Sequence, residues 1–476
     1  MATRPARHGD RLYIDGRWET PDEELEVTDL ADGGTFTTVA KATPEQAEAA
    51  LAAAERAEDR IAAASVVERA GWMEEIAAGL EGRTDELAEI IVREAGKPIS
   101  SARGEVASAA ERFRRAAEEI RNRSGEFREG STDGHEGWRA IVKHEPVGTV
   151  LAITPYNYPL STTALQVAPA LAAGNAVIHK PATHTPVSGA VLAEVIEESG
   201  VPSGAYNYLP GKSSEIGDIL ASDDRIEAIA MTGSSAAGEH VARQSGMVTL
   251  HMELGGNAPV LVFPDADLDA AAADCAKGSF KYAGQRCSAV SRVLAHDDVH
   301  DDLVARIEAT MDDWATGDLF DEDTSVGPLI DEAQADYVEE LIDDAVERGA
   351  TLVRGGERDG RTIQPALLAD VPHDARILHE EQFGPVAAVA RVADEEEALA
   401  LANAGDLALD GAVFTADYDR AMRVAEALDA GGVRINGAPS HGLGDIPFGG
   451  NDASGIGREG LNTTIEAFTT TKSIVL

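Results

Sequence analysis

Cysteine is almost absent from this sequence: Cys275 and Cys287 are its only two thiols among 476 residues. Two cysteines are too few for a disulfide framework, and the scattered histidines show no metal-ligand spacing, so we expect no metal ion. Long apolar runs are absent too, because stretches such as 147–153 are soon interrupted by proline, glycine or polar residues. No apolar segment follows the first arginines, which argues against a secretory signal. We therefore expect a cytoplasmic protein that contacts no membrane.

Lysine is scarce as well, with 8 residues in the whole chain. Lysine and arginine together number 40 against 84 aspartates and glutamates, a formal net charge of −44. A surface this acidic repels nucleic acid, which we exclude as a partner. The 43% of hydrophobic residues nevertheless supply a core that a disordered acidic chain would lack. Our hypothesis is a halophilic source, in which concentrated salt screens the self-repulsion, with an acidic mesophilic enzyme as the alternative.

Three regions follow one another along the chain. Residues 43–126 show apolar residues at helical spacing and predict long amphipathic helices. Residues 147–254 alternate short β-rich runs with helical stretches, and residues 255–457 repeat the alternation. This period predicts parallel sheets and a fold of the α/β class with two α/β domains. Residues 127–146 predict a hairpin with a turn near Asp133-Gly134, and the chain ends on a β-prone tail, TTTKSIVL.

Cys287 lies in the segment YAGQRCSAV, just before a predicted strand. A single cysteine is most often a small buried hydrophobe, and we interpret Cys275, in an alanine-rich helical run, in that way. Gly284 and Arg286 favour a second interpretation of Cys287, because a nearby cation stabilises a thiolate. Cys287 is therefore a candidate nucleophile, with a buried structural cysteine as the alternative.

Two further polar residues stand where a strand is expected to end. Glu253 closes an apolar run in HMELGGN, ahead of Gly255 and Gly256. It is a candidate general base whose pKa apolar surroundings would raise, or else a carboxylate that caps a turn. Asn157 lies between prolines in TPYNYP, and its amide can donate to a developing oxyanion. The alternative for Asn157 is an ordinary turn asparagine.

Two other predicted strand ends have the features of a cofactor site. One strand ends at Thr232, Gly233 permits a close turn, and a helix is expected to begin near Ser234, which makes a pyrophosphate site. Lys180 closes another strand, at the edge where α/β sheets bind ligands. The only GxGxxG match, GIGREG near the C-terminus, lacks a following βαβ unit, so we do not interpret it as a dinucleotide site.

Taken together, these segments resemble the aldehyde dehydrogenase superfamily. The resemblance runs in order over nearly the whole chain and rests on seven motifs: PYNYP, KPATHTP, MTGS, ELGGN, GQRC, EEQFGPV and PFGG. It implies a Rossmann-like cofactor domain (1–123 and 147–254), a second α/β catalytic domain (255–458) and a small β oligomerisation extension (124–146 and 459–476). It also implies a homodimer or homotetramer.

The resemblance assigns roles to matching positions. Cys287 matches the nucleophile, Glu253 the general base and Asn157 an oxyanion donor that acts with the Cys287 backbone N–H. The implied reaction oxidises an aldehyde to a carboxylic acid through a thioester on Cys287, with hydride transfer to NADP or NAD. The remaining matches are the cofactor residues Lys180, Gly233, Ser234, Glu381 and Phe383. A general base favours hydrolysis over acyl transfer to coenzyme A. A catalytically retired structural homologue is the remote alternative.

Cofactor and substrate preferences rest on single positions. Strongly NAD-preferring members often carry glutamate three residues after the ribose lysine, whereas this chain has Thr183, which favours NADP. Within the superfamily the sequence resembles the non-phosphorylating glyceraldehyde-3-phosphate dehydrogenase and lactaldehyde dehydrogenase branch. Tyr158 and Arg286 match two phosphate ligands of that branch. Ser108 and His441 stand where two arginines are expected, and Arg112 can substitute for one. Glyceraldehyde 3-phosphate, lactaldehyde, a sugar-derived semialdehyde and succinate semialdehyde are the candidate substrates.

Overall fold

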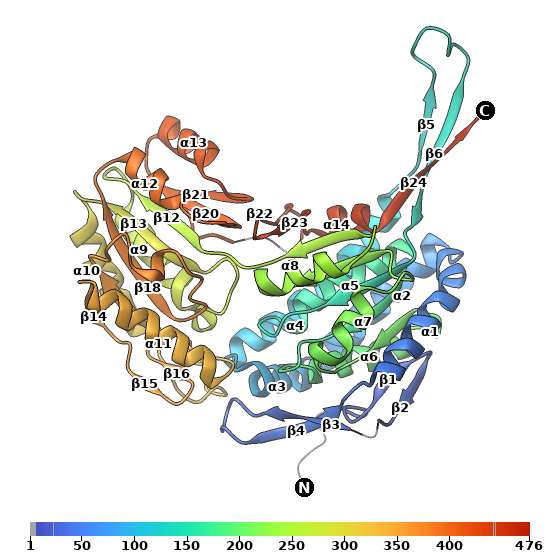
Figure 1. The fold of residues 1–476 in the computed structure, drawn as a ribbon, viewed down its shortest axis with the longest axis horizontal. Helices are drawn as coiled ribbons and strands as arrows, with labels where there is room; N and C mark the ends of the chain where they lie inside the picture. Colours follow the sequence, from blue (N-terminus) through green and yellow to red (C-terminus); the bar gives the residue numbers. More distant parts are fainter. Residues whose placement is uncertain (1–5, 22, 441, 443) are drawn as a thin grey trace.

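A computed structural model describes residues 6–21, 23–440, 442 and 444–476. Figure 1 shows two lobes that are each built on a sheet, and a long β arm that projects from the lobe containing the N-terminal half of the chain. Within the described residues, no helix combines the length and apolar character that a bilayer crossing requires.

The first sheet is mixed, with a parallel centre. Its eight strands follow the order β2 (Arg17–Glu19), β1 (Leu12–Ile14), β9 (Tyr206–Tyr208), β8 (Ala176–Lys180), β7 (Thr149–Ile153), β10 (Ala228–Thr232), β11 (Thr249–Glu253) and β23 (Gly455–Ile456). The strands from β9 to β11 are parallel, as predicted, whereas β1 and β2 at one end of the sheet and β23 at the other pair antiparallel with their neighbours. These short edges were not predicted from the sequence, because they are held by pairing with distant residues, such as Tyr13 with Tyr208.

Helices cover both faces of this sheet, because alternate residues of a strand point to opposite sides. On β7, Val150 and Ala152 join one apolar core while Leu151 joins another. The helices of this lobe are α1 (Pro44–Ala62), α2 (Val66–Gly82), α3 (Thr84–Ala95), α4 (Ile99–Asn122), α5 (Ser161–Ala173), α6 (Val187–Glu198), α7 (Asp218–Ala221), α8 (Ser235–Gln244) and α14 (Leu461–Ala467). Thr43 begins α1 with a capping box to Gln46, which satisfies free N–H groups of the first turn.

The second sheet repeats the pattern. Its order is β14 (Thr351–Arg354), β17 (Ala366–Ala369), β18 (Val386–Val392), β13 (Val290–His296), β12 (Ala258–Val262), β20 (Asp410–Phe414) and β21 (Gly432–Ile435). All neighbours are parallel except β14. The accompanying helices are α9 (Leu268–Phe280), α10 (His300–Thr310), α11 (Glu332–Glu347), α12 (Glu395–Ala402) and α13 (Tyr418–Ala427). The predicted α/β class with two sheets is therefore confirmed.

The arm is a three-stranded antiparallel sheet. The predicted hairpin is formed by β5 (Glu126–Glu129) and β6 (Arg139–Pro146), and the tail forms β24 (Thr469–Val475) beside β6. Figure 1 shows this arm extending away from both lobes. Small two-stranded ribbons complete the fold: β3 (Glu24–Thr28) with β4 (Thr35–Ala40), β15 (Arg358–Asp359) with β16 (Thr362–Ile363), and β19 (Leu407–Ala408) with β22 (Asn451–Asp452).

Candidate active site

The carboxyl ends of four parallel strands meet at one edge of the first sheet. Lys180 pairs with Ile153, Met231 pairs with Ile153 from the other side, and Thr232 pairs with Glu253. The chain order reverses between β7 and β10, because β8 lies on one side of β7 and β10 on the other. Open α/β sheets bind ligands at such a point.

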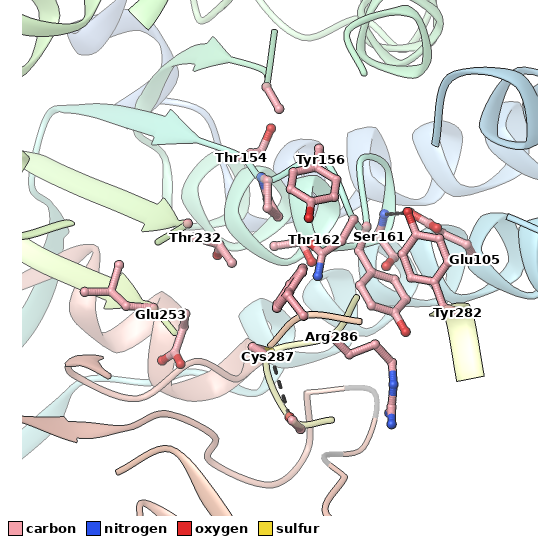
Figure 2. A pocket seen from close by; sticks show the side chains of 18 of the residues that line it. Glu105, Thr154, Tyr156, Ser161, Thr162, Thr232, Glu253, Tyr282, Arg286 and Cys287 are labelled. Carbon is pink, nitrogen blue, oxygen red and sulfur yellow. Dashed lines mark hydrogen bonds between the residues drawn. The ribbon is translucent and has the colours of Figure 1, made fainter. Parts of the chain in front are cut away.

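A pocket of about 1100 Å³ opens at this edge. Eleven of the twelve residues predicted from the sequence line it: Asn157, Tyr158, Lys180, Thr183, Gly233, Ser234, Glu253, Arg286, Cys287, Glu381 and Phe383. The twelfth, His441, lies outside the described residues, and its neighbours Ser440 and Gly442 line the pocket. Figure 2 shows Cys287 and Glu253 approaching the pocket from different segments of the chain.

A sharp turn before β13 brings Cys287 into the pocket. Helix α9 ends at Phe280, and the backbone then becomes left-handed at Tyr282, Ala283 and Gly284. A Cβ on Gly284 would overlap the Gly384 carbonyl, so only glycine fits there. Cys275, by contrast, is fully buried in α9, which confirms its interpretation as a core residue.

Burial controls the ionisation of Cys287. It raises the pKa of this thiol to about 12, against a smaller lowering effect of the Ser288 hydroxyl. The carboxyls of Asp410, Glu253 and Glu381 raise this pKa further. The expectation that Arg286 stabilises the thiolate is therefore not met: its Nη2 donates to the Gly278 carbonyl at 2.6 Å instead. The raised pKa favours the thiol over the thiolate, so attack on a carbonyl requires a proton acceptor.

Glu253 has the surroundings of a general base. It is buried at the end of β11, and both of its carboxyl oxygens lack a hydrogen-bond partner of normal geometry among the described residues. Burial and the nearby Glu459 carboxyl raise the pKa of Glu253 well above its usual value, while the Glu459 backbone N–H and Arg458 lower it less. A Cβ on Gly449 would stand 2.5 Å from Oε1, so glycine leaves space beside the carboxyl.

Asn157 lies on the loop between β7 and α5. Its Nδ2 donates to the Gln285 carbonyl at 2.9 Å, two residues before Cys287. Glu105 of α4 fixes this loop, because its Oε1 accepts the backbone N–H groups of Leu160 and Ser161 at 3.0 and 3.1 Å. The amide donor and the nucleophile are thus held in the same part of the pocket.

The cofactor end of the pocket fits a phosphate-bearing ligand. Helix α8 begins next to Ser234, as predicted, and the Ser234 hydroxyl caps it by accepting the Ala237 N–H at 3.3 Å. Gly233 leaves the approach to this helix N-terminus without a side chain. Lys180 is buried and has no acidic partner among the described residues; burial lowers its pKa to about 8. An ammonium without a counter-charge fits an anionic or hydroxyl-rich ligand. The Thr183 hydroxyl contacts the Gly211 carbonyl at 3.3 Å.

Glu381 and Phe383 also line the pocket. Glu381 Oε1 accepts the Gly256 N–H at 2.8 Å, and burial raises the pKa of this carboxyl to about 7. A Cβ added at Gly255 would lie 2.8 Å from the other carboxyl oxygen, Oε2 of Glu381. The Phe383 ring centroid lies 6.1 Å from that of Tyr156. Glu381 thus presents a carboxyl, and Phe383 an aromatic face, suited to a ribose and a flat ring.

The substrate end gathers cations. Lys97 lies 3.5 Å from the Tyr158 ring centroid and forms a buried ion pair with Glu105. Arg112 donates to the Ser161 carbonyl. The Nε atoms of Arg112 and Arg286 are both buried and have no hydrogen-bond partner among the described residues. Both arginines lower the pKa of Tyr158, which burial nevertheless raises to about 12. Lys97 is neutralised by Glu105, whereas Arg112 and Arg286 each keep a buried N–H group without a partner among the described residues.

Sequence reasoning missed three buried carboxyls. Glu105 fixes the Asn157 loop, Glu459 faces Glu253, and Asp410 lies beside Ser288. Glu459 belongs to the GIGREG segment, which carries β23 and not a dinucleotide loop. Asp410 is the first residue of an apolar strand, so a carboxyl beside an apolar run, as at Glu253, could have pointed to it.

Comparisons with known proteins cover nearly the whole chain. The model of the aldehyde dehydrogenase family matches residues 18–474. An NADP-dependent glyceraldehyde-3-phosphate dehydrogenase of Streptococcus equinus is 38% identical over 465 residues, 97% of this chain and 98% of the relative. A succinate-semialdehyde dehydrogenase [NADP(+)] of Escherichia coli (strain K12) is 37% identical over 467 residues, 96% of each chain.

A solved structure agrees with these relatives. The NADP complex of the NADP-dependent glyceraldehyde-3-phosphate dehydrogenase of Bacillus halodurans C-125 superposes with a TM-score of 0.96. It is 36% identical and covers 98% of this chain and 99% of its own.

Proposed function

The chain belongs to the aldehyde dehydrogenase family, and from this premise we propose that Cys287, Asn157 and Glu253 carry out its reaction. The fold is that of the family, and the enzyme is an NAD(P)-dependent dehydrogenase that oxidises an aldehyde to a carboxylic acid. The observation that carries the residue assignment is the meeting of all three side chains in one 1100 Å³ pocket with the cofactor end.

In the proposed mechanism, the Cys287 thiolate adds to the aldehyde carbon and forms a thiohemiacetal. The Asn157 amide and the Cys287 backbone N–H donate to the developing oxyanion, where loss of one donor typically costs about 10²–10³ in rate. When bound, the nicotinamide would serve as acceptor for the hydride that the thiohemiacetal carbon must lose to become a thioester. Glu253 then takes a proton from water, and the hydroxide formed releases the acid. Its raised pKa makes the Glu253 carboxylate a stronger proton acceptor than an ordinary carboxylate.

NADP is the cofactor that we propose to be preferred over NAD. Lys180 would hold the adenosine ribose, Gly233 and Ser234 the pyrophosphate, Glu381 the nicotinamide ribose, and Phe383 would pack near the nicotinamide. Thr183 supports NADP, because its hydroxyl can donate to a 2′-phosphate and it brings no negative charge. The two relatives and the solved structure above are also described as NADP enzymes.

Substitution Thr183→Glu tests this preference. The added carboxylate should repel the 2′-phosphate, so the KM for NADP should rise about tenfold or more while the KM for NAD changes little. Initial rates measured with both cofactors give these values. Ser214→Glu is the matched control, because it adds the same charge near Gly211, in a residue that does not line the pocket. Equal changes in the KM for NADP and the KM for NAD would show that Thr183 does not select the cofactor.

The substrate that we propose is a small aldehyde with an anionic group. Tyr158 and Arg286 would bind this group, together with Arg112. Glyceraldehyde 3-phosphate and a semialdehyde such as succinate semialdehyde both meet this description, and lactaldehyde is the uncharged alternative. We also propose that His441 contacts the substrate.

We further propose the three predicted domains, a cytoplasmic location and a homodimer or homotetramer. Exposed apolar side chains on the arm, including Phe127, Trp138, Ile141, Ile474 and Val475, support its use in oligomerisation.

Cofactor reduction with a panel of these aldehydes tests the function. We expect reduction of NADP with an anionic aldehyde and release of the free acid, identified by mass spectrometry. The assay should be run in low salt and in molar KCl, because the proposed halophilic source predicts a faster and more stable enzyme in salt. Turnover that requires coenzyme A, or no turnover with any aldehyde, would contradict the proposed reaction. Activity and stability that salt does not improve would contradict the halophilic source.

A further inference from the structure

Lys97 is a buried cation to which the mechanism above gives no part. It lies between α3 and α4 and is only 1% exposed. Among the described residues, its one hydrogen-bond partner is the Glu105 carboxylate. Burial lowers the pKa of Lys97 to about 8, although the Glu105 charge opposes this effect. Replacing a buried ion pair with apolar side chains is often neutral or stabilising, so stability alone does not account for the pair.

The Lys97 ammonium lies over the rings of two tyrosines. Its Nζ is 3.5 Å from the ring centroid of Tyr158 and 4.3 Å from that of Tyr282. The face of an aromatic ring attracts a cation, and the attraction is strongest where water is excluded. Tyr158 directly follows Asn157, and Tyr282 belongs to the left-handed turn that precedes Cys287. One buried cation therefore contacts the segments that carry the oxyanion donor and the nucleophile.

Further contacts tie both segments to Lys97. The Glu105 carboxylate that pairs with Lys97 also accepts the Ser161 N–H at 3.1 Å, the contact drawn as a dashed line in Figure 2. This bond fixes the start of α5, where the loop of the oxyanion donor ends. The Tyr282 hydroxyl donates to the Ala95 carbonyl at 2.8 Å, two residues before Lys97. These bonds and the two ring contacts join the three segments into one unit.

We propose that Lys97 holds the Asn157 amide at the distance from Cys287 that an oxyanion requires. The inference rests on the proposed roles of Asn157 and Cys287. Asn157 Nδ2 donates to the Gln285 carbonyl at 2.9 Å, so the amide already lies against the turn of the nucleophile. A shift of either segment moves this donor, and a misplacement of about 1 Å can lower a rate about 10²-fold. Lys97 acts through the two tyrosines and is thus a positioning residue.

The substitution Lys97→Met tests the proposal in the full-length enzyme. Methionine keeps an unbranched apolar chain but removes the charge from the two rings. Stopped-flow absorbance follows NADPH formation in the first turnover, with NADP bound and with an aldehyde that the unaltered enzyme oxidises. At saturating aldehyde the rate should fall about 10–100-fold, because the oxyanion donor is misplaced. The KM for the aldehyde should change little, and so should cofactor binding, followed by fluorescence titration.

A double-mutant cycle with Asn157→Ala separates positioning from a general structural role. Asn157→Ala should lower the first-turnover rate about 10²–10³-fold, the usual cost of losing one oxyanion donor. Adding Lys97→Met should lower the rate by no more than about threefold further, because a donor that is absent cannot be misplaced. A structural role unconnected with Asn157 would instead give additive losses, and that result would overturn the proposal.

A second variant removes both charges of the pair. Lys97→Met alone leaves the Glu105 carboxylate buried without its counter-ion, which is strongly destabilising. The double variant Lys97→Met/Glu105→Gln keeps an amide oxygen for the Ser161 N–H. It should show the same loss of rate, and it replaces Lys97→Met in the cycle if the single variant does not fold. Lys143→Met is the control and should keep the rate, because Lys143 pairs with Glu145 on the arm and does not line the pocket.

The remaining outcomes also decide the assignment. An unchanged first-turnover rate in folded Lys97→Met or in the double variant would overturn it. A raised KM for an anionic aldehyde, with the saturated rate retained, would make Lys97 a substrate ligand and also overturn it. If Asn157→Ala itself leaves the rate unchanged, the proposed oxyanion donor fails, and Lys97 loses the residue through which it acts. Additive losses in the cycle remove Lys97 alone, so the two failures are distinguishable.

Discussion

Replacing Cys287 with alanine should reduce aldehyde-dependent NADP reduction by about 10⁴-fold or more. Alanine cannot form the thiohemiacetal, and loss of a covalent nucleophile typically removes most of the rate enhancement of an enzyme. The measurement is the turnover rate in saturating cofactor and aldehyde. Cofactor binding, followed by fluorescence titration, should change little, because Lys180 and Ser234 at the cofactor end remain in place.

Cys275→Ala is the matched control for this prediction. The Cys275 thiol is fully buried in α9 and does not line the pocket, so the variant should keep its turnover and lose only a little stability. The two variants separate loss of the nucleophile from loss of a buried thiol. If the turnover of Cys287→Ala stayed within tenfold of that of the unaltered enzyme, Cys287 would be ruled out as nucleophile. The alternative of a catalytically retired structural homologue would then gain support.

Replacing Glu253 with glutamine should stop the reaction after the thioester. We expect a rapid burst of about one reduced NADP per active site, followed by turnover about 10²–10⁴-fold slower, because hydrolysis loses its general base. Stopped-flow absorbance resolves the two phases. Hydroxylamine attacks thioesters without a base, so it should restore turnover and yield a hydroxamate. A variant without a burst would place Glu253 before thioester formation instead.

The pH dependence has a defined sign. Only the ionised carboxylate of Glu253 accepts a proton, and its pKa is raised, so hydrolysis should slow as the pH falls through that raised value. Glu253→Gln should lose this dependence in its slow phase. Glu227→Gln is the control: burial raises the pKa of Glu227 too, but this residue precedes β10 at the opposite end of the strand and does not line the pocket.

Local patterns in the sequence were enough to locate much of the candidate site. Strand endings predicted the placement of Lys180, Thr232 and Glu253, because parallel strands that alternate with helices bring their carboxyl ends to one edge. A helix start near Ser234 was also predicted, and the structure shows that the Ser234 hydroxyl caps this helix. The family resemblance added Glu381 and Phe383, whose own neighbours carried no signal, and it favoured the oxyanion role of Asn157 over that of a turn asparagine. All three line the pocket.

The tertiary structure alone decided which charged groups meet. Glu459 reaches Glu253 because β23 crosses back to pair with β11, and no local pattern encodes a contact between residues 206 positions apart. Asp410 lies beside Ser288 for a similar reason, since neighbouring segments of the second sheet come from distant parts of the chain. Burial then set the ionisation of Cys287, against the expectation drawn from its neighbour Arg286. Desolvation depends on everything packed around a group, so it can be read only from the folded chain.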